Sequence, residues 1–85
     1  MYLNVCLATC PMLNTWLKGT KIKHYNNIKT WQKCSQKCTV TPLCVAWDWR
    51  SPKHFNVRYR ERCIVMSAQT NSEAQDNRVS GLKSC

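Results

Sequence analysis

Seven cysteines in a chain of 85 residues are the feature that most limits how this sequence can fold. A domain of this size buries only about 60% of the surface that its unfolded chain exposes, so its hydrophobic core needs further support. Disulfide bonds supply that support in short chains, and they persist in oxidising compartments. The cysteine content therefore predicts a disulfide-bonded protein that is secreted or extracellular, secretory organelles included.

The N-terminal stretch does not fit a targeting signal. Residues 1–10 are mildly apolar, but they lack a basic n-region and Asn4 interrupts the apolar run. No stretch of the chain approaches the roughly 18 apolar residues of a membrane span. We therefore expect residues 1–85 to form a single module excised from a longer secreted protein, with no membrane span.

The segment from Thr30 to Cys38 has the pattern of a short helix. Cys34 and Cys38 are one helical turn apart, so both thiols leave the same face and can bridge to strands beneath it. Thr30 is a suitable N-cap because its hydroxyl can accept a hydrogen bond from a free backbone amide in the first turn. The pattern predicts a helix over about residues 31–39 with one buried face. That face contains Trp31, Cys34, Ser35 and Cys38.

Short strands and loops account for most of the remaining pattern. Residues 16–22 are predicted as a strand, and residues 45–50 alternate with the two-residue period of a strand. Residues 69–78 are polar and show no periodicity, so we expect an exposed loop there. Residues 79–85 are expected to form a last short strand that the terminal Cys85 ties down. One helix with several strands indicates a small, disulfide-rich α+β fold.

A set of motifs spread over most of the chain resembles a known family. The motifs are Gly19-x-x-Ile22, Cys34-x3-Cys38-x5-Cys44, the aromatic residues Trp47 and Trp49, Cys63 followed by apolar residues, and Val79-Ser80-Gly81 before Cys85. Together they resemble the PAN/Apple module of plasma prekallikrein, coagulation factor eleven, hepatocyte growth factor and the apicomplexan microneme adhesins. This resemblance implies a curved antiparallel β-sheet that cradles one helix.

The resemblance also implies a disulfide pairing, which spacing alone does not choose. The implied pairs are Cys34–Cys63 and Cys38–Cys44, with a third bridge joining the N- and C-terminal strands. Either Cys6 or Cys10 can supply the partner of Cys85, and we favour Cys10 because its distance to Gly19 is closer to the microneme-type members. Cys6 is then spare. It is either an intermolecular thiol that links two copies into a dimer or a thiol whose partner lies outside this chain segment.

The tryptophans are interpreted mainly as structural. Trp47 occupies the position where PAN/Apple modules keep a buried aromatic residue, and Trp31 lies on the cysteine face of the helix, so both are expected in the core. Trp16, beside Gly19, is a candidate for lining a groove, where it would stack on a sugar or another ligand. Packing within the core or against a strand is the more common role for such a ring.

Basic residues carry the clearest functional signal, because 13 lysines and arginines against four acidic residues give a formal net charge of +9. Lys29, Lys33 and Lys37 form a cationic row on and before the helix. Residues 57–66 alternate as a strand would, which places the side chains of a second row on one face about 7 Å apart. That second row consists of Arg58, Arg60 and Arg62, and Arg50, Lys53 and His54 extend it.

Such rows suit successive anionic groups on an extended polymer, although an ordinary solvated face has the same composition. We expect an adhesion or recognition module that binds a protein or an anionic glycan on a cell surface or in the extracellular matrix. The most specific form of this expectation is a sulfated glycosaminoglycan as the ligand. The alternatives are a basic nucleic-acid-binding domain and a secreted cysteine-rich inhibitor or toxin. For the adhesion or recognition module that we expect, no nucleic-acid partner is predicted.

No reaction chemistry is indicated. A zinc site built from the clustered cysteines with His24 or His54 is an alternative, but seven cysteines spread toward both termini fit a disulfide framework better. Four acidic residues without a recognisable nucleophile and base do not form an acid/base or nucleophilic site. We therefore expect a protein that is not an enzyme, with no catalytic residues, no cofactor and no metal.

Overall fold

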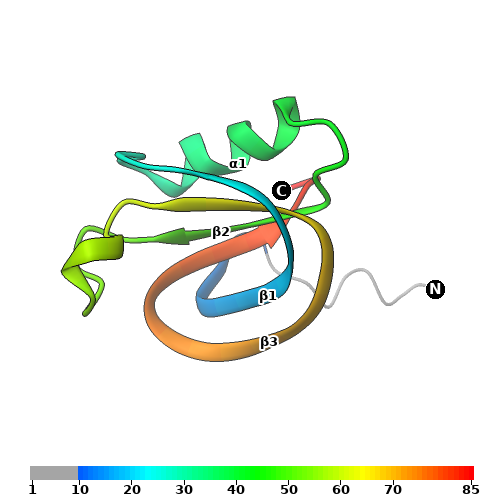
Figure 1. Ribbon diagram of the computed structural model, residues 1–85. Helices are drawn as coiled ribbons and strands as arrows, with labels where there is room; N and C mark the ends of the chain where they lie inside the picture. Colours follow the sequence, from blue (N-terminus) through cyan, green and yellow to red (C-terminus); the bar gives the residue numbers. More distant parts are fainter. Residues whose placement is uncertain (1–9) are drawn as a thin grey trace.

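The computed structural model describes residues 10–85, which fold as a small α+β unit with one α-helix and a three-stranded sheet (Figure 1). The predicted α+β class is therefore confirmed. The sheet order is β1-β3-β2. The elements are β1 at Met12–Tyr25, α1 at Trp31–Val40, β2 at Ala46–Arg50, the 3₁₀ turn η2 at Val57–Tyr59, and β3 at Cys63–Leu82.

β1 and β3 form a long antiparallel ribbon that curls back on itself, and β2 lies between the two ends of β3 (Figure 1). Tyr25 at the end of β1 lies opposite Cys63 at the start of β3. Ala46 of β2 lies opposite Met66 on one side and opposite Leu82 on the other. Residue numbers rise along β2 while they fall along both partner segments, so both pairings are antiparallel.

Irregular pairing lets the ribbon curl. Register shifts interrupt the β1–β3 ladder between Leu13 and Thr15 and again at three places between Lys18 and Lys23. At the first shift, Asn14 and Asn77 have positive φ angles of 51° and 63°, a region that asparagine enters more readily than most residues. The Asn77 backbone amide donates a hydrogen bond to Asn14 Oδ1 at 3.2 Å. Such bulges increase the local twist of a strand, so they help the ribbon to close around β2.

Residues 69–78 belong to β3, so the prediction of an exposed loop over this segment is wrong. Residues 69–74 pair with Thr15–Gly19 of β1, and those backbone hydrogen bonds hold this part of the segment extended. Most of its side chains are exposed, so the sequence there has no apolar alternation to reveal a strand. Residues 79–85 are not a separate strand either, because they contain the end of β3 followed by a turn.

α1 begins and ends where its sequence pattern predicts. Thr30 is the N-cap, and its Oγ1 accepts a hydrogen bond from the Lys33 backbone amide at 3.3 Å. Cys34, Ser35 and Cys38 are buried on the face toward the sheet, as expected. Within residues 10–85, no helix is long and apolar enough to cross a bilayer.

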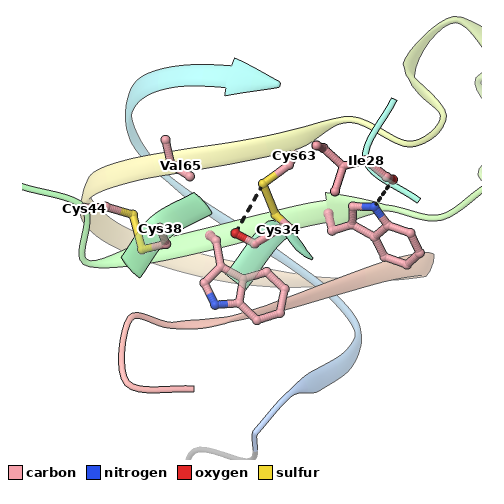
Figure 2. Close-up of a cluster of buried hydrophobic side chains, with 8 residues drawn as sticks. Ile28, Cys34, Cys38, Cys44, Cys63 and Val65 are labelled. Atoms are coloured by element: carbon pink, nitrogen blue, oxygen red, sulfur yellow. Dashed lines mark hydrogen bonds between the residues drawn. A yellow bond between two sulfur atoms is a disulfide. The ribbon is translucent and has the colours of Figure 1, made fainter. Parts of the chain in front are cut away.

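The main core lies between α1 and the sheet (Figure 2). Trp47 is fully buried there, as predicted, and its ring stacks parallel to the half-buried Trp31 with 5.9 Å between ring centroids. Trp49 is also buried, and its indole Nε1 donates a hydrogen bond to the Ile28 carbonyl oxygen at 2.8 Å. This bond secures the loop that leads from β1 to the helix.

A second, smaller core lies on the other face of the sheet, inside the curl of the ribbon; we call this the concave face. Leu17, Ala46 and Met66 are buried there, with Met12 and Ile64 packed against them. β2 is therefore covered on both faces. Its alternation assigns the tryptophans to the helix side and Ala46, Asp48 and Arg50 to the concave side.

Three disulfides join these layers, and they are the pairs that the PAN/Apple resemblance implies. Cys34–Cys63 connects α1 to the start of β3, and Cys38–Cys44 connects α1 to the loop before β2 (Figure 2). Cys10–Cys85 joins the two ends of the described chain across a sequence separation of 75 residues. Cys6 lies outside the described residues, so its predicted role stays a prediction.

Candidate anion-binding surface

Few of the positive charges have an acidic partner. In the described part of the chain, Lys29 pairs with the half-buried Glu61 at 2.8 Å, and the half-buried Lys18 pairs with Glu73 at 2.5 Å. Arg78 pairs with Asp48 inside the protein, where both side chains are buried. The other lysines and arginines form no ion pair within residues 10–85, so the surface is strongly cationic.

The lysine row on α1 is present only in part. Lys33 is exposed and lines an open groove of about 450 Å³ beside the helix. Lys37 is half-buried, with its Nζ 5.0 Å from the centroid of the Tyr25 ring. Lys29 is engaged by Glu61, which neutralises part of the row. The groove is lined by Asn27, Ile28, Lys33, Gln36, Lys37 and Val40.

The predicted arginine row does not exist as a strand face, because β3 begins only at Cys63. Arg58 lies in η2, where Asn56 Oδ1 accepts a hydrogen bond from the Arg58 backbone amide at 3.1 Å. Arg60 follows in a turn, and Arg62 lies between that turn and the start of β3. This cap and the positive φ angle of Glu61 (61°) turn the chain instead of extending it, so the three guanidinium groups do not share one face.

Two residues predicted for the basic patch, His54 and Arg60, instead help to build the loop before η2. His54 is only 1% exposed, and its Nδ1 accepts a hydrogen bond from the Asn56 backbone amide at 3.1 Å. Arg60 Nε donates to the His54 carbonyl oxygen at 2.7 Å. His54 and Arg60 therefore stabilise the loop, whereas Lys53 and Arg58 remain exposed on it.

A different cluster of basic side chains gathers on the concave face. Lys21 and His24 of β1 lie opposite Met66 and Ile64, and this places them on the side of the second core. Arg50, at the end of β2, occupies the same face by the alternation of β2. Its backbone amide donates to the Arg62 carbonyl oxygen at 3.0 Å, which brings Arg62 alongside.

The two arginines of this cluster share one aromatic ring. The Cζ atoms of Arg50 and Arg62 lie 5.2 Å and 4.6 Å from the centroid of the Tyr59 ring. Arg62 Nε also donates to Asn26 Oδ1 at 3.1 Å. The pKa of His24 is lowered, first by partial loss of hydration and then by the charges of Arg62, Lys21 and Arg50. Four nitrogen-bearing side chains from three parts of the chain thus converge, and we call Lys21, His24, Arg50 and Arg62 the concave cluster.

Arg50 is the least satisfied member of the concave cluster. Its Nε and Nη1 are buried and have no hydrogen-bond partner within the protein. Loss of hydration and the nearby charge of Arg78 lower the pKa of Arg50, and the neighbouring Asp48 only partly offsets this. The Asp48 carboxylate is already engaged, because it pairs with Arg78 and accepts a hydrogen bond from the Leu17 backbone amide at 3.2 Å.

Beside the concave cluster is a cleft of about 290 Å³ with an apolar floor. Trp16 lines it, as the sequence suggested, but cations already lie over the Trp16 ring. Lys18 Nζ and Arg78 Cζ are each 4.3 Å from its centroid. The lining residues are Trp16, Leu17, Lys18, Gly19, Lys21, Arg50, Ile64 and Met66.

Sequence reasoning missed most of this cluster because its members come from separate segments. The sequence pattern assigns Arg50 only to an extension of the arginine row, and it offers His24 only as an alternative zinc ligand. The alternation of residues 45–50 does separate Arg50 from the tryptophans, but nothing in the sequence indicates that Lys21 would face it. A curled ribbon is needed to bring them together.

Comparison with known proteins adds no family assignment. No protein-family model matches this chain, and a search of curated proteins found no match either.

Proposed function

We propose that this chain is an extracellular recognition module of the PAN/Apple type that binds an anionic glycan or an acidic protein through its cationic surface. In this proposal the module is secreted or displayed outside the cell, and it carries out no reaction. The helix groove and the concave cluster are its two candidate contact surfaces.

One observation carries the proposal: the fold is held by three disulfides, and most of its many cations have no acidic partner within residues 10–85. Disulfide frameworks of this density are typical of secreted domains. Unpaired cations concentrated on a small, rigid surface attract anionic partners and hold them through charge-assisted hydrogen bonds. The motif resemblance and the curved sheet that supports one helix favour the PAN/Apple assignment.

The test compares folded and unfolded chains that have the same net charge. We expect the oxidised domain to bind immobilised heparin more tightly than the reduced chain with its thiols capped by iodoacetamide, because only the fold gathers the cations. Binding by the folded domain should weaken steeply between about 50 mM and about 200 mM salt. Equal binding by the two chains would mean that net charge alone explains retention and would overturn the proposal.

Two further probes separate the partner classes. An acidic protein without glycans and a single-stranded oligonucleotide are offered under the same conditions. Preference for the oligonucleotide would favour the nucleic-acid-binding alternative, which depends on tryptophan rings available for stacking. Three of the four tryptophans lie in the main core or stack within it, and cations lie over the ring of the fourth. We therefore expect heparin or the acidic protein to bind better.

A further inference from the structure

We infer that the concave cluster, together with the adjoining cleft, is a binding site for one sulfate or carboxylate group on a sugar ring of an acidic saccharide. This inference rests on the proposed function and specifies which surface carries it. It assigns the site to Lys21, His24, Arg50 and Arg62 instead of the helix row.

Charge is the first argument for this site. None of the ion pairs in residues 10–85 involves the four side chains of the concave cluster. Two carboxylates lie nearby, and both are engaged. Asp48 is held by Arg78 and by the Leu17 amide, and Glu61, which precedes Arg62, pairs with Lys29. Like charges held this close repel each other, so a bound oxyanion would relieve the repulsion. The site is therefore better suited to hold an anion than to remain empty.

Rigidity is the second argument. Arg50 and Arg62 are both half-buried, and Tyr59 supports both guanidinium groups. Arg62 is further fixed by its hydrogen bond to Asn26. Side chains that are already ordered lose less entropy on binding than an exposed lysine such as Lys33 of the helix row. The unpartnered Arg50 nitrogens indicate a guanidinium that is held in place by packing and not by a partner within the protein.

The shape of the cleft indicates the kind of molecule that carries the anion. Its volume of about 290 Å³ is at the lower end for ligand pockets, which suits one ring and not an extended aromatic ligand. Ile64 and Met66 give it an apolar floor, and Lys21 and Arg50 stand beside that floor. A pyranose ring has an apolar face and carries its acidic group at the edge, so it matches both features. A nucleobase would need an open aromatic ring, and cations lie over Trp16.

The experiment titrates the oxidised domain with small saccharides and follows backbone amide shifts by NMR. A heparin-derived sulfated disaccharide tests the sulfate, a hyaluronan-derived disaccharide tests the carboxylate, and lactose is the neutral control. We expect shifts that centre on Lys21, His24, Arg50 and Ile64 with at least one acidic disaccharide and none with lactose. Shifts centred on Lys33 and Lys37 would overturn the inference.

Three variants complete the test, and the first two lose the same formal charge. The variant with Lys21→Ser and Arg62→Gln should bind the acidic disaccharide roughly tenfold more weakly or worse, since two charge-assisted contacts are lost. The matched control carries Lys53→Ser and Lys83→Ser, which remove two exposed charges elsewhere, and it should bind almost as the parent does. Because Arg62 also supports the fold, a second variant with Lys21→Ser and His24→Ser changes only exposed side chains and should weaken binding as well.

The outcomes separate the two proposals. If the folded domain binds heparin better than the unfolded chain but cleft variants and control bind equally, the concave site is wrong and the proposed function stands. If the folded domain has no advantage over the unfolded chain, the proposed function itself fails. An acidic peptide or an oligonucleotide that shifts the same amides more strongly than both disaccharides would overturn the saccharide assignment.

Discussion

At the scale of single residues, Asp48 and Arg78 form a buried ion pair. Both side chains are almost fully buried on the concave face, and the Leu17 amide donates a further hydrogen bond to Asp48. Removing one member of such a pair leaves an uncompensated buried charge, which costs about 3 to 5 kcal/mol. Burial raises the pKa of Asp48 to about 6, although the charge of Arg78 opposes the shift.

Asp48 should therefore make the fold less stable as the pH rises from about 4 to about 6. The pKa of an aspartate in an unfolded chain is about 3.9, so over this range the folded chain keeps a proton that the unfolded chain has released. The stabilisation from this proton is complete below about pH 4 and is lost as the pH rises through about 6. Urea unfolding of the oxidised domain across this range measures the slope.

The variant for this measurement replaces both members, with Asp48→Asn and Arg78→Met, so that no buried charge is left alone. It should show a flatter pH dependence than the parent. Asp76→Asn, which changes an exposed carboxylate, is the matched control and should keep the parental slope. A double variant whose slope equals that of the parent would contradict the assignment of the titration to Asp48.

At the scale of elements, the curl of the β1–β3 ribbon depends on the close approach of the two backbones. A Cβ atom added to Gly19 would lie 1.9 Å from the Ala68 carbonyl oxygen, which is far closer than any real contact. The obstacle is backbone, so no side chain can rotate away to make room. A register shift between Lys18 and Gly19 lies at the same place, so the close backbone approach coincides with irregular pairing.

Gly19→Ala should destabilise the domain by about 1 to 3 kcal/mol, because the two strands must separate locally to admit a methyl group. The neighbouring Thr20→Ala is the control; it should cost less than about 1 kcal/mol, since only strand preference changes at an exposed position. Chemical unfolding of both oxidised variants measures the difference. Equal stability of the two variants would show that the ribbon accommodates the methyl group without strain.

At the scale of the whole molecule, the disulfides that join α1 to the rest of the fold contribute to its free energy of unfolding. In the chain-entropy model, closing the loop between Cys34 and Cys63, with a sequence separation of 29, contributes about 3.6 kcal/mol. The separation of 6 between Cys38 and Cys44 gives about 2.4 kcal/mol. Such contributions are comparable to the net stability of a small domain.

Removing the Cys34–Cys63 bridge with Cys34→Ala and Cys63→Ala should therefore lower stability more than Cys38→Ala with Cys44→Ala. All four side chains are almost fully buried, so the packing loss is closely matched and the loop length makes the difference. Thermal unfolding and resistance to limited proteolysis of the two double variants test the order. A Cys34/Cys63 variant that melts above the Cys38/Cys44 variant would contradict it.

The sequence by itself determined the features that depend on neighbouring residues. Thr30 fixes the start of α1 because a cap needs only its own first turn, and the period of β2 assigns Trp47 and Arg50 to opposite faces. Spacing did not determine the disulfide pairing, which only the motif resemblance implied. The alternation of Arg58, Arg60 and Arg62 predicts a strand that does not form there, because the Asn56 cap turns the chain.

Only the tertiary structure decided what depends on distant residues. Residues 69–74 are extended because β1 supplies their hydrogen-bond partners, and no local pattern records that pairing. The concave cluster exists because the ribbon curls far enough to bring Lys21 of β1 to the same face as Arg50 of β2. A surface of this kind is set by how strands bend and close, and that bending comes from contacts that are formed only when the whole chain has folded.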